Sequence, residues 1–72
     1  MAKFRIGQRV RIVRLPAYVK TAEPMPMLRS PQVLELGEEG VILAYSPGGE
    51  WSVRCQRGAY LLAEQYLEAV EP

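Results

Sequence analysis

The middle of the chain alternates between apolar and polar positions in a way that predicts three short antiparallel strands. The apolar, β-forming runs are residues 41–45, 51–55 and 59–62, and each connection between them contains glycine. In the second run, every other residue from Trp51 to Cys55 falls on one face of the strand. Because a lone hairpin is marginal in water, we expect the rest of the chain to pack around this unit.

The connection between the first two strands contains Pro47 and Gly48, which suit the centre of a type II turn. Proline presets φ at the first central position, and glycine accepts the positive φ that the second position needs. The sequence therefore predicts a type II turn with its positive φ at Gly48.

Alternation with a period of two also marks the N-terminal part of the chain. Apolar residues occupy even positions between Phe4 and Ile12, and arginines occupy odd positions, with one interruption. We expect the first long strand at residues 9–15, with its arginines facing outward. Pro16 ends this strand because it has no N–H to donate.

Residues 16–31 are predicted to form a long loop without regular structure. Pro24, Pro26 and Pro31 disfavour a continuous helix, and each proline pushes the residue before it toward extended geometry. Loops of this length are uncommon in small domains and are usually functional or disordered. The apolar content of this one argues against disorder, so we expect it to fold back over the sheet.

The C-terminal half supplies the remaining elements. We expect a short extended piece at residues 33–36, a 3₁₀ turn at 63–66 and a last strand at 67–70. Together these patterns predict an all-β fold, with residues 1–72 as a single domain. The architecture is expected to be an SH3-like small barrel of about five antiparallel strands, with a long first loop and a 3₁₀ turn before the last strand.

The composition excludes several classes of protein. With 49% hydrophobic residues the chain should fold, and its apolar runs are too short to span a bilayer, so no membrane insertion is expected. The first residues do not lead into the apolar segment of a secretory signal. One cysteine excludes an internal disulfide and fits a reducing compartment, so the predicted location is cytoplasmic.

The residues needed for catalysis are largely missing. The chain has no histidine, so neither Ser-His nor Cys-His nucleophile pairs can form, and one thiol without imidazole does not make a zinc site. Cys55 is in phase with Trp51, which indicates a small core residue rather than a reactive thiol. We therefore expect no enzyme activity, no cofactor and no metal.

Charge is distributed unevenly. The first 29 residues hold seven basic residues and one acidic residue, whereas the rest hold two basic and seven acidic residues. Either a basic docking face results, or basic and acidic strands become neighbours and neutralise each other. The residues of such a face are Lys3, Arg5, Arg9, Arg11 and Arg14. No aromatic residues are interleaved with them, so a solvated face is favoured over nucleic-acid binding.

The long loop carries the strongest candidate for a protein-binding site. Methionines adapt to partners, while aromatic residues and arginine often anchor interfaces. The candidate residues are Tyr18, Lys20, Met25, Met27, Leu28, Arg29 and Trp51. The alternative is that the methionines and Leu28 plug an open end of the barrel and that Trp51 lies in the core.

Four stretches, residues 4–11, 15–29, 37–40 and 51–54, together resemble the SipA family of small cyanobacterial proteins that interact with the sensor histidine kinase NblS. The most specific part is the segment from Tyr18 to Arg29. The resemblance implies a non-catalytic regulatory adaptor that binds the ATP-binding catalytic region of an NblS-like sensor histidine kinase and modulates stress signalling. It also implies a PipX-like coactivator as a further partner.

Two other functions stay open at this point. One is an SH3-like photosystem I subunit that docks ferredoxin, where a basic face would steer an acidic electron carrier. That subunit lacks the Pro-Met-Pro-Met sequence of this chain. The other is an RNA-binding small barrel, whose binding would depend steeply on salt.

Overall fold

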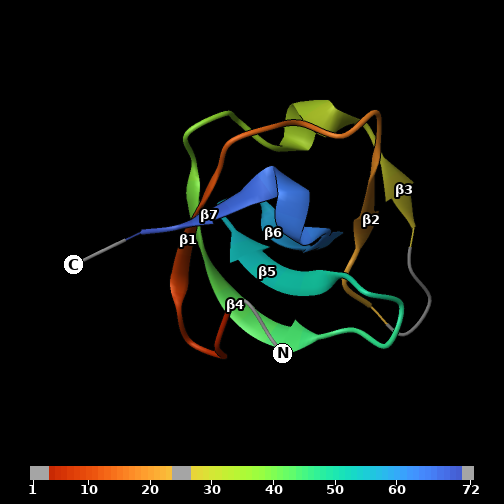
Figure 1. The fold of residues 1–72 in the computed structure, drawn as a ribbon. Helices are drawn as coiled ribbons and strands as arrows, with labels where there is room; N and C mark the ends of the chain where they lie inside the picture. The colour runs from red at the N-terminus through yellow and green to blue at the C-terminus, as the bar shows by residue number, and fades with distance from the viewer. Residues whose placement is uncertain (1–3, 24–26, 71–72) are drawn as a thin grey trace.

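The computed structural model describes residues 4–23 and 27–70. In these residues the fold is all-β, with seven strands in one antiparallel sheet and two 3₁₀ turns, η1 (Pro31–Val33) and η2 (Glu64–Tyr66). The strands are β1 (Arg9–Ile12), β2 (Val19–Thr21), β3 (Leu28–Arg29), β4 (Glu39–Tyr45), β5 (Trp51–Cys55), β6 (Gly58–Leu62) and β7 (Leu67–Ala69). Figure 1 shows the strands curled around a shared interior, with β3 lying outside β2.

The strand order across the sheet is β3-β2-β6-β5-β4-β1-β7. The meander β4-β5-β6 lies at its centre, β1 and β7 extend one side, and β2 and β3 extend the other. Within the described residues, β3 and β7 are the outer strands, so the sheet is open. The predicted all-β class is confirmed, whereas closure into an SH3-like barrel is not established, and the sheet has more strands than expected.

The central meander was predicted well because its strands alternate clearly. β5 has the expected bounds, while β4 begins two residues earlier and β6 one residue earlier than predicted. The connection between β4 and β5 differs from the prediction. Gly49, not Gly48, has the positive φ, at 87°, and its N–H donates to the Ser46 carbonyl over 3.0 Å. The type II prediction was therefore wrong.

The prediction of an irregular loop at residues 16–31 was wrong in the described part. β2 pairs with β6, with Lys20 opposite Leu61, and β3 pairs in turn with β2. The alternation of apolar and polar residues in β2 is only three residues long, too short to predict a strand by itself. The segment is a strand because its backbone pairs with β6. Met25 was part of this prediction and lies outside the described residues.

Two smaller predictions also need correction. β1 ends at Ile12 rather than at residue 15, because β7 begins opposite Ile12 and no partner strand continues beyond it. The extended piece expected at residues 33–36 is not found, because Val33 belongs to η1 and residues 34–36 form no strand. The Ser30 hydroxyl caps η1 by accepting from the Gln32 N–H over 3.2 Å. The second 3₁₀ turn and the last strand are confirmed to within one residue of the predicted bounds.

The inward faces of the strands form one hydrophobic core. Phe4 packs edge-on against Trp51, with ring centroids 5.4 Å apart. The buried core residues are Phe4, Val10, Ile12, Val19, Leu34, Ile42, Trp51, Val53, Cys55, Tyr60, Leu62 and Leu67. The described part of the chain contains no helix long and apolar enough to cross a membrane.

Gly40 is the tightest point of the central pairing. A Cβ atom at this position would lie 2.7 Å from the Arg54 carbonyl oxygen and 2.8 Å from Cγ1 of Val53. Backbone cannot move aside cheaply, so β4 and β5 can approach each other here only because residue 40 has no side chain.

We expect Gly40→Ala to lower the free energy of unfolding by about 2 kcal/mol, the usual cost of overpacking a close contact. Urea unfolding would measure the loss. The matched control is Gly48→Ala, because the nearest atom to a Cβ there is the Ser46 hydroxyl oxygen, 3.9 Å away. Equal stability of the two variants would contradict this account of the β4-β5 contact.

Cys55 ends β5 with its side chain in the core. Burial, with a smaller contribution from the neighbouring Glu38 carboxylate, raises the pKa of the Cys55 thiol from 9.0 to about 12. The group therefore stays a neutral thiol in the folded protein at neutral pH, as the sequence interpretation expected of a core cysteine.

Native Cys55 should react with a disulfide reagent at pH 8 far more slowly than the thiol of the urea-unfolded chain. Above about pH 9 the unfolded thiol ionises while the folded one stays protonated up to a pKa of about 12. Stability should consequently fall between pH 9 and pH 12 more steeply in the natural chain than in Cys55→Ala. Labelling of the native protein as fast as that of the unfolded chain would contradict the burial of the thiol.

Candidate protein-binding surface

The β2-β3 hairpin brings three of the predicted binding residues onto the outer face of the sheet. Lys20 lies directly opposite Leu28 in the ladder, and Val19 points to the core. Tyr18, adjacent to Val19, is 61% exposed, and Leu28 is 63% exposed. Large apolar side chains this exposed, gathered on one hairpin, are typical of an interaction surface.

Tyr18 and Lys20 also line a groove that continues across the sheet, which we call the Tyr18–Tyr66 groove. Its volume is about 250 Å³. The lining residues are Pro16, Tyr18, Lys20, Glu50, Leu61, Leu62, Ala63 and Tyr66. β2 supplies one wall, β6 the floor and η2 the far end, so the groove depends on the pairing of β2 with β6.

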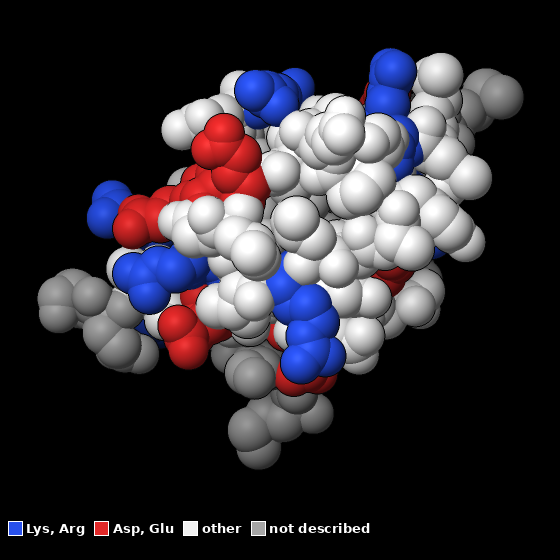
Figure 2. All heavy atoms as spheres, turned by 90° about the horizontal axis from the view of Figure 1, so that it is seen from above, with Lys and Arg blue, Asp and Glu red and all other residues white. Residues whose placement is uncertain are grey.

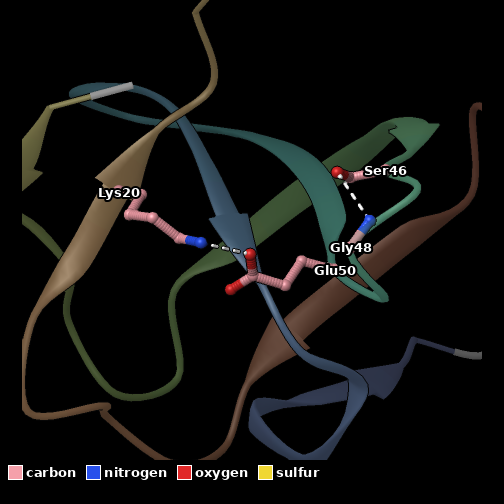
Figure 3. Close-up of polar contacts among 4 residues, drawn as sticks. All are labelled: Lys20, Ser46, Gly48 and Glu50. Carbon is pink, nitrogen blue, oxygen red and sulfur yellow. Dashed lines mark hydrogen bonds and ion pairs between the residues drawn. The ribbon is translucent and has the colours of Figure 1, made fainter. Parts of the chain in front are cut away.

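A charge pair crosses the floor of this groove. The Lys20 Nζ atom lies 2.8 Å from Oε1 of Glu50, and Figure 3 shows the two side chains meeting above β6. Glu50 is positioned by the β4-β5 turn, where the Ser46 N–H donates to the Glu50 carbonyl over 2.7 Å and the Gly48 N–H donates to the Ser46 hydroxyl over 3.4 Å. Partly exposed pairs stabilise little, so this pair chiefly fixes where charge lies in the groove.

The other predicted binding residues lie elsewhere. Met27 is 53% exposed, and its N–H donates to Oγ1 of Thr21 over 2.9 Å. Arg29 lies opposite Val19, on the face that Leu28 does not share. Trp51 is only 3% exposed and packs between Phe4 and Tyr45, so it belongs to the core and is absent from this surface.

Sequence reasoning missed Leu61 and Tyr66. The outward orientation of Leu61 follows from the inward ones of Tyr60 and Leu62, so the period-two pattern could have revealed it. Nothing in the sequence signals Tyr66, because it reaches the groove only through the position of η2 beside β6. The binding role of the predicted set as a whole stays a prediction.

The basic N-terminal segment does not form an isolated positive face. β1 lies between β4 and β7, where Arg9 comes within 3.8 Å of Glu39 and Arg11 within 3.5 Å of Glu68. On the face drawn in Figure 2, blue basic and red acidic side chains lie next to each other. For Arg9 and Arg11, the predicted alternative of neutralisation between neighbouring strands is the one found. Arg5 and Arg14 form no ion pair within the described residues, and Lys3 lies outside them.

The acidic residues Glu38 and Glu39 both make contacts within the fold. The Glu38 carboxylate accepts from the Glu35 N–H over 3.0 Å and from the Gln56 N–H over 2.7 Å, which ties the start of β4 to the β5-β6 turn. Glu39 faces outward to Arg9. No group of three or more cysteine, aspartate or glutamate residues that could hold a metal ion occurs in residues 4–23 and 27–70.

Comparison with known proteins identifies relatives of the whole segment. A family model described as Protein CHLORORESPIRATORY REDUCTION 42-like matches residues 6–67. The chain is also 37% identical over 71 residues to Protein CHLORORESPIRATORY REDUCTION 42, chloroplastic, from Arabidopsis thaliana. This alignment covers 97% of the chain but only 59% of that relative. No solved structure matches the chain.

These findings correct the functional expectations from sequence. The assignment to the SipA family was wrong, and with it the adaptor function on an NblS-like kinase and the PipX-like partner. The ferredoxin-docking and RNA-binding alternatives receive no support either. The cytoplasmic location is overturned because the curated relative is a chloroplast protein.

The SipA resemblance rested on four separate stretches, whereas the family model matches one continuous stretch, residues 6–67, which ends at the first residue of β7. A match of that extent outweighs separate motifs. The chain belongs to the CRR42-like family.

Proposed function

We propose that this chain is a non-catalytic protein-binding module that serves chlororespiratory reduction and contacts its partner through the Tyr18–Tyr66 groove. Membership of the CRR42-like family and the name of the Arabidopsis relative support the assignment to chlororespiratory reduction. The chain spans 59% of that relative, so the module corresponds to only part of the longer protein. The lack of histidine and the buried, protonated thiol support a role without catalysis.

The observation that carries the proposal is the composition of the groove. Two tyrosines flank an apolar floor at Leu61, and an ion pair spans it, which is the mixture of aromatic anchors and polar groups found in protein interfaces. Its volume of about 250 Å³ is below the usual range for small-molecule sites. It therefore suits one or two side chains of a protein partner better than a cofactor.

We further propose that residues 1–72 act as one domain and that the curled sheet is a variant of the SH3-like barrel. The order of a first strand, a hairpin, a three-stranded meander, a 3₁₀ turn and a last strand supports this relation. The β2-β3 hairpin then occupies the place of the long first loop of such barrels.

A chimera tests the proposed function. The matching segment of the Arabidopsis relative is replaced by this chain, and the chimera is expressed in plants that lack the relative. We expect the chimera to restore chlororespiratory electron transfer, and Tyr18→Ala with Tyr66→Ala to abolish at least about nine-tenths of it, since aromatic anchors dominate interface energies.

The matched control is Tyr45→Ala, because Tyr45 is 57% exposed but lies outside the groove. It should leave restoration intact, and circular dichroism should show all variants folded. A folded groove variant that restores electron transfer fully would rule out the groove as the contact surface.

A further inference from the structure

A second concave region lies at the other end of β2, and we call it the Arg29–Arg57 hollow. Its volume is about 470 Å³. The end of β2, the start of β6, η1 and β3 each contribute to its wall. The lining side chains that matter below are Thr21, Glu23, Arg29, Val33, Arg57 and Ala59.

Two arginines from distant parts of the chain line this hollow. Arg29 ends β3, and Arg57 lies in the tight turn between β5 and β6. Nη1 of Arg57 donates to the Gln32 carbonyl over 2.9 Å, and the Tyr60 hydroxyl donates to the Arg57 carbonyl over 3.2 Å. These contacts hold Arg57 in place while leaving most of its donors unused.

Neither arginine has an acidic partner within residues 4–23 and 27–70. The ion pairs found there join Arg9, Arg11 and Lys20 to glutamates on neighbouring strands. Glu23 lines the same hollow, yet no ion pair joins it to either guanidinium. Five arginines form no ion pair within those residues, namely Arg5, Arg14, Arg29, Arg54 and Arg57. Two of them, Arg29 and Arg57, line the same concavity.

We propose that the Arg29–Arg57 hollow binds aspartate or glutamate side chains of an acidic segment in the protein partner. The proposal rests on the proposed protein-binding function and names the chemistry of the partner. Guanidinium forks bind carboxylates through paired hydrogen bonds, and arginine clusters commonly recognise acidic motifs. Val33 and Ala59 supply apolar wall for the methylene groups of such side chains.

The test is an NMR titration of the full chain, labelled with ¹⁵N, at low salt. The probe is the blocked peptide acetyl-Gly-Glu-Glu-Gly-amide, and its Gln-Gln counterpart is the neutral control. We expect the acidic peptide to shift the side-chain Nε–Hε signals of Arg29 and Arg57 and the neutral peptide to shift neither. Arg29→Gln and Arg57→Gln should each weaken binding about ten-fold.

Arg54→Gln is the matched control, because Arg54 also has no ion pair in the described residues and lies outside the hollow. It should change the affinity less than two-fold. Should Arg57→Gln fail to fold, Arg57→Lys keeps the charge without the planar fork and should still weaken binding several-fold.

Three results would overturn the proposal: shifts absent from both arginines, equal loss in the Arg54 variant, or binding of inorganic phosphate in place of the peptide. Tyr18→Ala should leave peptide binding unchanged. A failed titration therefore leaves the chimera test of the groove intact, and a failed chimera leaves the peptide result standing.

Discussion

The antiparallel pairing of β2 with β6 forms both of the concave surfaces at which a partner is proposed to bind. Lys20 opposite Leu61 brings the aromatic and charged side chains of the Pro16–Lys20 end over the floor of β6, and Thr21 opposite Tyr60 brings the other end toward the β5-β6 turn. The Tyr18–Tyr66 groove and the Arg29–Arg57 hollow lie at the two ends of the β2-β6 pairing. A shift of one residue in this register would reverse every side chain of β2 and remove both.

The polar groups of the chain divide between structural and exposed positions. The Glu38 carboxylate accepts hydrogen bonds from two backbone N–H groups, and the arginines of β1 form ion pairs with glutamates on β4 and β7. The charged groups that remain exposed to a partner include the Lys20–Glu50 ion pair in the groove and the two arginines that line the hollow. The proposed binding of a protein partner rests on these exposed charged groups at the two ends of the β2-β6 pairing.

Two of the stretches behind the misleading family resemblance have a physical explanation. Glycine turns and the Trp-x-Val-Arg pattern satisfy requirements that any small curled sheet must meet, namely a close β4-β5 approach at Gly40 and an aromatic core against Phe4. Residues that serve the fold therefore cannot separate families that share such a sheet. The match over residues 6–67 is continuous and therefore also covers positions outside those requirements.

The sequence by itself determined the all-β class, the central meander, the inward faces of β1 and β5, and the 3₁₀ turn before the last strand, because each is encoded by a local alternation or turn signal. Only the tertiary structure decided that Val19–Thr21 is a strand, since its hydrogen-bond partners lie about forty residues away on β6. It also decided that Trp51 is core and that Tyr66 faces a groove. A period of two distinguishes the faces of a strand, but the packing of distant elements determines which face is covered.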